Sequence, residues 1–110
     1  MWWWPFNERA TTKRRPALVL SDAGNFNKQV GQSVLAMITS AKNSSWPLDV
    51  EIGNLDLAGL PSASVVRMNL FTLDDRLVIR KAGVLSKTDT LAVLHTLHQL
   101  FNLKIHRKNN

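Results

Sequence analysis

The chain contains no cysteine and no long apolar run. The absence of cysteine excludes a disulfide framework, a thiolate metal site and a thiol nucleophile. No segment approaches the ~20 consecutive apolar residues that cross a bilayer, so we expect no membrane association. The first residues hold three successive tryptophans but neither a basic segment nor a long apolar stretch, which argues against a secretory signal. These absences together predict a cytoplasmic protein.

Acidic residues are also scarce, because eight Asp and Glu stand against fourteen Lys and Arg, for a formal net charge of +6. A positive field attracts polyanions, so nucleic acid is the first partner to consider, and a merely solubilising charge is the alternative. At 110 residues, of which 45% are hydrophobic, the chain suits one domain over residues 1–110 with a single core.

Short apolar runs between turn-forming residues predict strands along most of the chain. The expected strands cover residues 2–6, 16–21, 34–39, 48–52, 64–68 and 77–80. Pro5 favours an edge position for the first strand, since proline cannot donate to a neighbour. The strict period-two alternation of 48–52 predicts a half-exposed strand. Polar loops are expected at 7–14 and 41–45, a turn at 22–25, and a break at Gly83.

The last element is of a different kind. Ser86 followed by Asp89 resembles a capping box, which predicts a helix that begins at Lys87. On a helical wheel the apolar half holds Val93, Leu94, Leu97, Leu100 and Phe101, and the polar half holds Asp89, His95, Thr96 and Gln99. A mainly β protein with helices (α+β) follows: a small SH3-like β-barrel with a C-terminal amphipathic helix, with an orthogonal sandwich as the competing architecture.

The junction of a basic turn and an apolar run at residues 13–21 is the most informative local feature. Pro16 biases Arg15 towards an extended backbone, and the apolar residues that follow anchor it in a strand. A guanidinium held in this way suits a phosphate ligand. The alternative is a structural role, as a strand-edge cap or in an ion pair with Glu8 or Glu51.

Several segments, taken in order along nearly the whole chain, resemble the MazF/PemK family of toxins. The matching segments are KRRPALVLS (13–21), AMITS (36–40), WPLDVEI (46–52), SVVR (64–67) and FTLD (71–74). Members of this family are SH3-like barrels that form homodimers, cleave single-stranded RNA without a metal or other cofactor, and are silenced by a cognate antitoxin. The resemblance implies a type II toxin that cuts mRNA by 2′-hydroxyl attack, leaves a 2′,3′-cyclic phosphate and inhibits growth.

The resemblance also implies roles for individual residues. The family's catalytic arginine corresponds to Arg15, its strand-end hydroxyl residue to Thr39, and its second arginine to Arg67. The aspartate that usually stands two positions beyond the second arginine is Asn69 here, and an amide cannot accept the proton, so no general base is identified. The residues expected to contact RNA are Lys13, Arg14, Ser40, Trp46 and Asn69.

The chemistry of RNA cleavage accounts for these residue types. Because the attacking 2′-hydroxyl belongs to the substrate, the enzyme needs only proton transfer and charge stabilisation. The planar guanidinium of Arg15 would stabilise the phosphorane through paired hydrogen bonds. Thr39 would donate to a non-bridging oxygen, and Arg67 would bind phosphate or protonate the leaving 5′-oxygen.

Each of these assignments has a structural alternative. Thr39 is also an ordinary β-branched strand residue, and Arg67 also suits a solvated strand face. Trp46 would stack on an unpaired base, or it would lie in the core or at a dimer interface. His95 and His98 share H-x-x-H spacing, but no third ligand is near in sequence, so no metal site is expected.

Two other function classes remain open at this point. One is a non-catalytic SH3-like module that binds RNA or a protein, which Asn69 favours. The other is a toxin of CcdB-like type that poisons gyrase. Retention of Arg15 and Thr39 favours the nuclease.

Overall fold

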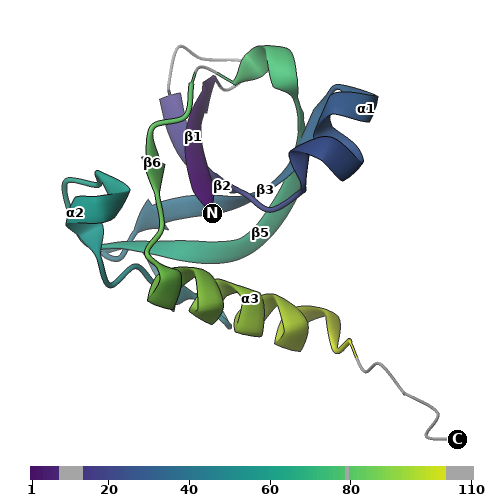
Figure 1. The fold of residues 1–110 in the computed structure, drawn as a ribbon. Coiled ribbons are helices and arrows are strands. Elements are labelled where there is room, and N and C mark those ends of the chain that lie inside the picture. The colour runs from purple at the N-terminus through teal and green to yellow at the C-terminus, as the bar shows by residue number, and fades with distance from the viewer. Residues whose placement is uncertain (8–13, 79, 104–110) are drawn as a thin grey trace, which may run out of the picture.

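Six strands of the described chain form one antiparallel sheet that curls into a half-barrel, and a long helix packs against it (Figure 1). The computed structural model describes residues 1–7, 14–78 and 80–103. The strands are β1 (Trp2–Asn7), β2 (Arg14–Val19), β3 (Gln32–Ser40), β4 (Val50–Glu51), β5 (Ser64–Asp74) and β6 (Gly83–Val84), in the spatial order β4-β5-β3-β2-β1-β6. The helical elements are the π-helical turn η1 (Ala23–Asn27), α1 (Lys28–Val30), α2 (Leu55–Ala58), the 3₁₀ turn η2 (Asp75–Leu77) and α3 (Lys87–Phe101). The predicted SH3-like fold with a C-terminal helix is therefore confirmed.

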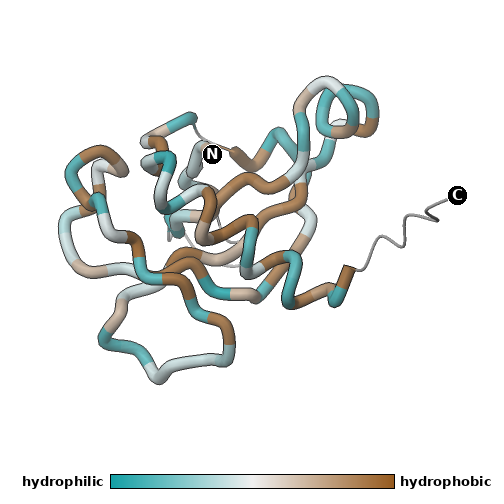
Figure 2. The backbone as a smooth tube through the Cα atoms, turned by 60° about the horizontal axis from the view of Figure 1, so that its bottom comes forward, coloured by the Kyte–Doolittle hydropathy of each residue, from teal (hydrophilic) through white to brown (hydrophobic). Residues whose placement is uncertain are grey.

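The central strands β2 and β3 are buried on both faces, as their continuous apolar runs predict. Neighbouring residues enter different cores because strand side chains alternate: Leu18 and Ala36 pack in one cluster, and Ala17 and Leu35 in the other. Figure 2 shows hydrophobic stretches along the central part of the tube and hydrophilic stretches at the turns around it. A one-residue slip of β2 or β3 would exchange the side chains between the two clusters.

The expected edge position of the first strand is wrong. β1 pairs with β2 on one side and, at Trp2 and Trp3, with β6 on the other. Pro5 is tolerated because the β6 ladder ends at Trp3, two residues before it. Successive tryptophans of β1 point to opposite faces, as strand side chains do: the Trp3 indole N–H donates to the Ala58 carbonyl at 2.5 Å, whereas Trp2 is 48% exposed.

Two other strand predictions fail for physical reasons. Of residues 48–52 only Val50 and Glu51 form a strand, because Leu48 adopts a left-handed φ of 65° within a turn. Of residues 77–80, Leu77 closes the 3₁₀ turn η2 and Val78 makes only an isolated bridge to Phe6. Residue 79 lies outside the described chain. Alternating apolar residues in short segments can therefore lie in turns as well as in strands.

Local signals at residues 22–25 and 83 have different outcomes from those expected. The Asp22 carboxylate accepts a hydrogen bond from the Asn25 N–H at 2.8 Å, but it caps the π-helical turn η1 rather than an isolated turn. Gly83 lies in β6 and is not a break. A Cβ at Gly83 would overlap the Ala58 carbonyl and the Trp3 indole, so glycine is needed there for close packing.

Helix α3 begins at Lys87 as predicted, with the Ser86 hydroxyl accepting the Asp89 N–H at 3.1 Å. The Asp89 carboxylate does not close a capping box. It accepts hydrogen bonds from the N–H groups of Gly53 and Asn54 at 2.9 and 3.0 Å, in the segment that follows β4. Asp89 therefore ties α3 to the sheet.

This tie rotates the helix relative to the predicted wheel. The buried side chains of α3 are those of Asp89, Val93 and Thr96, which share one face at spacings of four and three. Leu94 and Phe101 of the predicted apolar half are 47% and 55% exposed. The prediction is correct for Val93 and for the partly buried Leu97, and wrong for the placement of Asp89 and Thr96.

Candidate functional site

An open cleft of about 360 Å³ lies where β2 begins and β3 ends. Its lining residues are Arg14, Arg15, Pro16, Ile38, Thr39, Ser40, Asn43, Leu60, Pro61, Ser62 and Ser64. Four residues of the sequence-predicted site, Arg14, Arg15, Thr39 and Ser40, thus come together in one concavity.

The β-sheet register places Arg15 beside Thr39. Ala17 pairs with Met37 across the antiparallel β2–β3 ladder. Arg15 lies two residues before Ala17 on β2, and Thr39 lies two residues after Met37 on β3, so the antiparallel register places them opposite each other. Residues two apart on a strand point to the same face, so the guanidinium and the hydroxyl project from adjacent strands into the same cleft.

The Thr39 hydroxyl is held by a residue of the following loop. The Asn43 amide nitrogen donates to Thr39 Oγ1 at 2.6 Å, and the Asn43 backbone N–H donates to the Ser40 carbonyl at 3.1 Å. Because Thr39 Oγ1 accepts this bond, its own proton can be donated to a ligand in the cleft.

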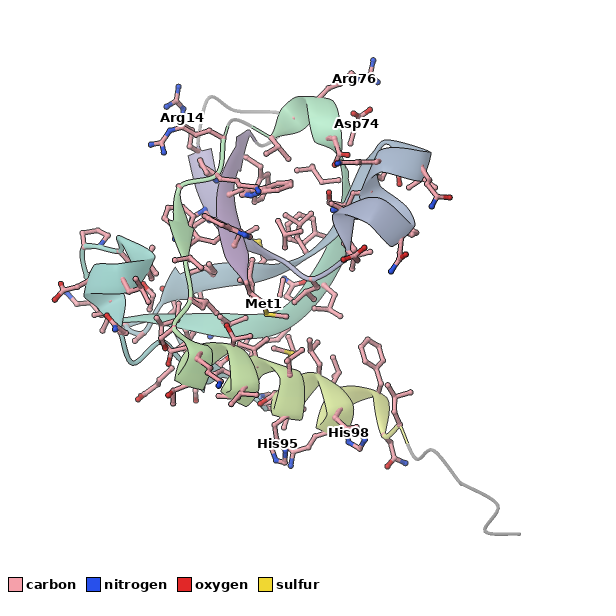
Figure 3. All side chains as sticks on the ribbon, viewed as in Figure 1. Met1, Arg14, Asp74, Arg76, His95 and His98 are labelled. Atoms are coloured by element: carbon pink, nitrogen blue, oxygen red, sulfur yellow. The ribbon has the colours of Figure 1, made fainter. Side chains whose placement is uncertain are left out.

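The cleft is suited to an anion. Two arginines line it, and none of the described residues that line it is acidic. Arg14 extends outward from the start of β2 (Figure 3). Arginine forms paired, charge-assisted hydrogen bonds with planar or tetrahedral oxyanions, and hydroxyls such as those of Thr39 and Ser40 complete such a site.

Arg67 lies elsewhere, against the loop that precedes β4. Its Nε and Nη2 donate to the two oxygens of Asp49 at 3.2 and 3.0 Å, and Nη2 also donates to the Ser44 carbonyl at 2.6 Å. The side chains of Arg67 and Asp49 are only 11% and 13% exposed. Arg67 is therefore not the solvated strand-face arginine of the structural alternative.

The electrostatics of this pair favour the ionised carboxylate. The hydrogen bond from Arg67 is the main cause that lowers the pKa of Asp49, with the Trp46 N–H and the positive charge of Arg67 acting in the same direction and burial opposing them. Asp49 is held as an anion by Arg67.

The other residues expected to contact RNA have different surroundings. Trp46 is 47% exposed, with the Arg67 guanidinium carbon 5.1 Å from its ring centroid, so it is not a core residue. Asn69 is an exposed residue of β5 that is not part of the cleft lining. Lys13 lies outside the described residues.

Sequence reasoning missed two residues of this region. In the sequence, Asn43 is one of several polar residues of a predicted loop, and its contact with Thr39 is visible only in the fold. Asp49 alternates with apolar neighbours, so its pattern indicated a solvated strand position rather than an ion pair. The available signal was the opposite charge of Arg67, but 18 residues separate the two and no local rule pairs them.

No metal or membrane feature stands out within the described residues. They hold no group of three or more His, Cys, Asp and Glu side chains arranged to bind a metal ion. His95 and His98 project from α3 on the side away from the sheet (Figure 3). None of the helices described has the length and hydropathy needed to cross a bilayer.

Comparison with known families matches residues 1–101 to the family described as PemK-like, MazF-like toxin of type II toxin-antitoxin system. The match spans the whole curled sheet and α3. Comparison with curated protein sequences gives no match.

Several solved structures share the fold. The toxin MazF-mt6 of Mycobacterium tuberculosis superposes with a TM-score of 0.76 at 21% identity, covering 96% of this chain and 100% of that chain. A MazE-MazF crystal structure from Deinococcus radiodurans has a TM-score of 0.72 at 27% identity, covering 93% and 92%. An endoribonuclease in complex with its cognate antitoxin, from a mycobacterial species, has a TM-score of 0.74 at 16% identity, covering 96% and 95%.

Proposed function

The chain belongs to the PemK-like, MazF-like toxin family of type II toxin-antitoxin systems, and from that premise we propose that it is a metal-independent endoribonuclease that cleaves single-stranded RNA. The observation that carries the proposal is the cleft between β2 and β3, in which Arg15 and Thr39 project from adjacent strands. These are two of the three positions at which the family resemblance expects catalytic groups; the third, Arg67, does not line the cleft.

The proposed reaction is an internal transfer at phosphorus. The 2′-oxygen of the substrate forms a bond to phosphorus as its proton passes to water, the bond from phosphorus to the 5′-oxygen breaks, and that oxygen takes a proton from water. The products are a 2′,3′-cyclic phosphate and a 5′-hydroxyl. Arg15 stabilises the extra negative charge of the phosphorane, and Thr39 donates to a non-bridging oxygen.

The size of the effect follows from preorganised charge stabilisation. One donor aimed at a developing oxyanion contributes roughly 3 to 4 kcal/mol, so Arg15→Ala should lower kcat by about two to three orders of magnitude. The assay uses a mixed single-stranded RNA in EDTA, with detection of 2′,3′-cyclic phosphate ends. Arg76→Ala is the matched control, because Arg76 is exposed and pairs only locally, with Asp74.

The outcomes separate the candidate functions. Cleavage that survives Arg15→Ala unchanged, or that needs an added divalent cation, contradicts the mechanism. RNA binding without cleavage by the wild type would indicate the non-catalytic module. Growth arrest without RNA cleavage would indicate a protein target such as gyrase.

The assembly of the protein is also a proposal. Solved relatives include a MazE-MazF structure and an endoribonuclease with its cognate antitoxin, so we propose a cognate antitoxin, a homodimer and a cytoplasmic site of action for this chain. Expression should arrest growth, and co-expression of the neighbouring reading frame should relieve the arrest. Light scattering of the purified protein tests the dimer.

A further inference from the structure

The loop between β3 and β4, residues 41–49, is held at both ends by hydrogen bonds of side chains and backbone rather than by packing. Residues 41–48 are all exposed. At the start of the loop, Asn43 bonds to Thr39, and the Lys42 N–H donates to Ser40 Oγ at 3.2 Å. At its end, Asp49 accepts the hydrogen bonds of Arg67. An exposed loop with few apolar contacts keeps one conformation only while such bonds persist.

A bulge in β5 directs Arg67 at this loop. Between the pairs Ala36–Leu70 and Ile38–Val66, β3 passes one residue, Met37, while β5 passes three, residues 67–69. Extra residues of this kind bend a strand and change the direction of their side chains. Val66 pairs with Val50 of β4, so the residue after Val66 lies next to the residue before Val50, which is Asp49.

The contacts of Arg67 occupy its guanidinium on several sides. Two nitrogens bind the Asp49 carboxylate, one of them also binds the Ser44 carbonyl, and the guanidinium carbon lies over the Trp46 ring. Asp49 in turn accepts the Trp46 N–H at 2.9 Å. A forked pair of this kind fixes orientation as well as distance, which a lysine would not do. We refer to Arg67 and Asp49 as the clamp.

The clamp is one residue away from the cleft. Ser44, whose carbonyl Arg67 holds, is bonded directly to Asn43, and Asn43 both lines the cleft and donates to the Thr39 hydroxyl. Movement of Ser44 therefore displaces Asn43 and frees Thr39 to rotate. Arg67 acts on the cleft through the loop without lining it.

We propose that Arg67 and Asp49 are positioning residues that set the 41–49 loop for single-stranded RNA, an inference that rests on the nuclease function proposed above. Through Asn43 the clamp orients the Thr39 hydroxyl. Through the guanidinium that lies over the Trp46 ring, it presents the exposed ring to an unpaired base beside the scissile phosphate, since aromatic rings bind single strands by stacking. This role differs from the direct phosphate contact that the family resemblance implies for Arg67.

The two roles of Arg67 make opposite predictions for Asp49. If the clamp positions the loop, Arg67→Ala and Asp49→Ala each lower kcat/KM by a similar factor, on the order of ten- to a hundred-fold, and the double variant loses no more than either single one. If Arg67 binds phosphate itself, Asp49→Ala releases the guanidinium and keeps or raises activity. That second result would overturn the proposal.

Tryptophan fluorescence gives a readout that does not depend on activity. The difference between each variant and its Trp46→Phe counterpart isolates Trp46 from the other three tryptophans. Asp49→Ala and Arg67→Ala should shift the Trp46 emission and raise its quenching by acrylamide, while the exposed-pair control Arg76→Ala leaves both unchanged. If the Trp46 emission of Asp49→Ala equals that of the wild type, the clamp is refuted, whether or not the wild type cleaves RNA. If the emission shifts but the wild type cleaves no RNA, only the nuclease function is refuted.

The stacking role of Trp46 has its own kinetic signature. Trp46→Ala should raise KM several-fold with little change in kcat, because the ring binds a base that does not react. Trp46→Phe should retain most of the affinity, since it keeps an aromatic face. An unchanged KM in Trp46→Ala would refute the base contact.

Discussion

The junction of α3 with the sheet and the cleft between β2 and β3 use polar side chains in opposite ways. At the junction, Asp89 is 6% exposed, and both of its carboxylate oxygens accept backbone N–H groups of the protein. At the cleft, Arg15 and Thr39 face an open volume of about 360 Å³. The first arrangement stabilises the fold, and the second leaves room for a ligand.

The comparison shows that polar residues of similar type differ in burial and contact: those of the junction bond within the protein, and those of the cleft border an open volume. A charged group whose polar atoms all form hydrogen bonds within the protein has no bonding capacity left for a substrate. A group that borders an open cleft keeps bonding capacity for one, as the Thr39 hydroxyl does with its own proton. Substitutions at the junction should therefore change stability alone, and substitutions in the cleft should change activity alone.

The largest effect on stability expected from this comparison is that of Asp89→Ala. The substitution leaves the N–H groups of Gly53 and Asn54 without their acceptors and removes a charge-assisted tie between α3 and the sheet. We expect the free energy of unfolding to fall by about 3 kcal/mol, which lowers the melting temperature by more than about 10 °C in a domain of this size. Thermal denaturation followed by circular dichroism measures it.

Two further measurements complete the Asp89 test. Asp56→Ala removes an exposed carboxylate from the first turn of α2 and should cost less than about 1 kcal/mol. RNA cleavage per folded Asp89→Ala molecule should equal that of the wild type at a temperature where the variant is folded. A loss of RNA cleavage in folded Asp89→Ala would contradict the expectation that substitutions at the junction change stability alone.

Sequence patterns predicted the elements whose signals are local. The apolar runs that became β2 and β3, and the Ser86 cap of α3, depend on alternation, burial and capping within a few residues. The wheel for α3 failed because Asp89 bonds to residues 35 and 36 positions away, and these bonds set the rotation of the helix. Composition cannot show that a polar residue will be satisfied at such a distance.

The candidate site was predictable to a similar extent. Arg15 and Thr39 came from the family resemblance, and the β2–β3 register places them side by side. The contacts of Arg67 were not predictable, because they depend on a bulge in β5 and on the left-handed turn at Leu48. Both are backbone irregularities that alternating patterns do not encode.

A smaller effect, on activity, is expected for Thr39→Val. Valine keeps the β-branched shape and removes the hydroxyl, so the strand is retained and the hydrogen bond to the phosphate is lost. Cleavage should fall about ten-fold, the value of one hydrogen bond to a charged group, with a melting temperature near that of the wild type. Thr39→Ser should keep activity within a few-fold. A large loss of stability in Thr39→Val would make Thr39 a structural residue, like Asp89.

The smallest effect expected is the pH dependence of the Arg67–Asp49 pair. The side chains of this pair are largely buried, as that of Asp89 is, and they lie close to the cleft. The Arg67 hydrogen bond lowers the pKa of Asp49 in the folded protein. Above the unfolded-state pKa of about 4, the ion pair therefore contributes its full stabilisation of the fold. This contribution is lost as the pH falls through the lower folded-state pKa. The difference in unfolding free energy between the wild type and Asp49→Asn should stay constant from pH 7 to about pH 5 and shrink below pH 4. It should not exceed about 1 kcal/mol, because the amide oxygen of the asparagine still accepts a hydrogen bond from Arg67. A difference that grows on acidification would mean that Asp49 is held in its protonated form, which contradicts an ion pair with Arg67.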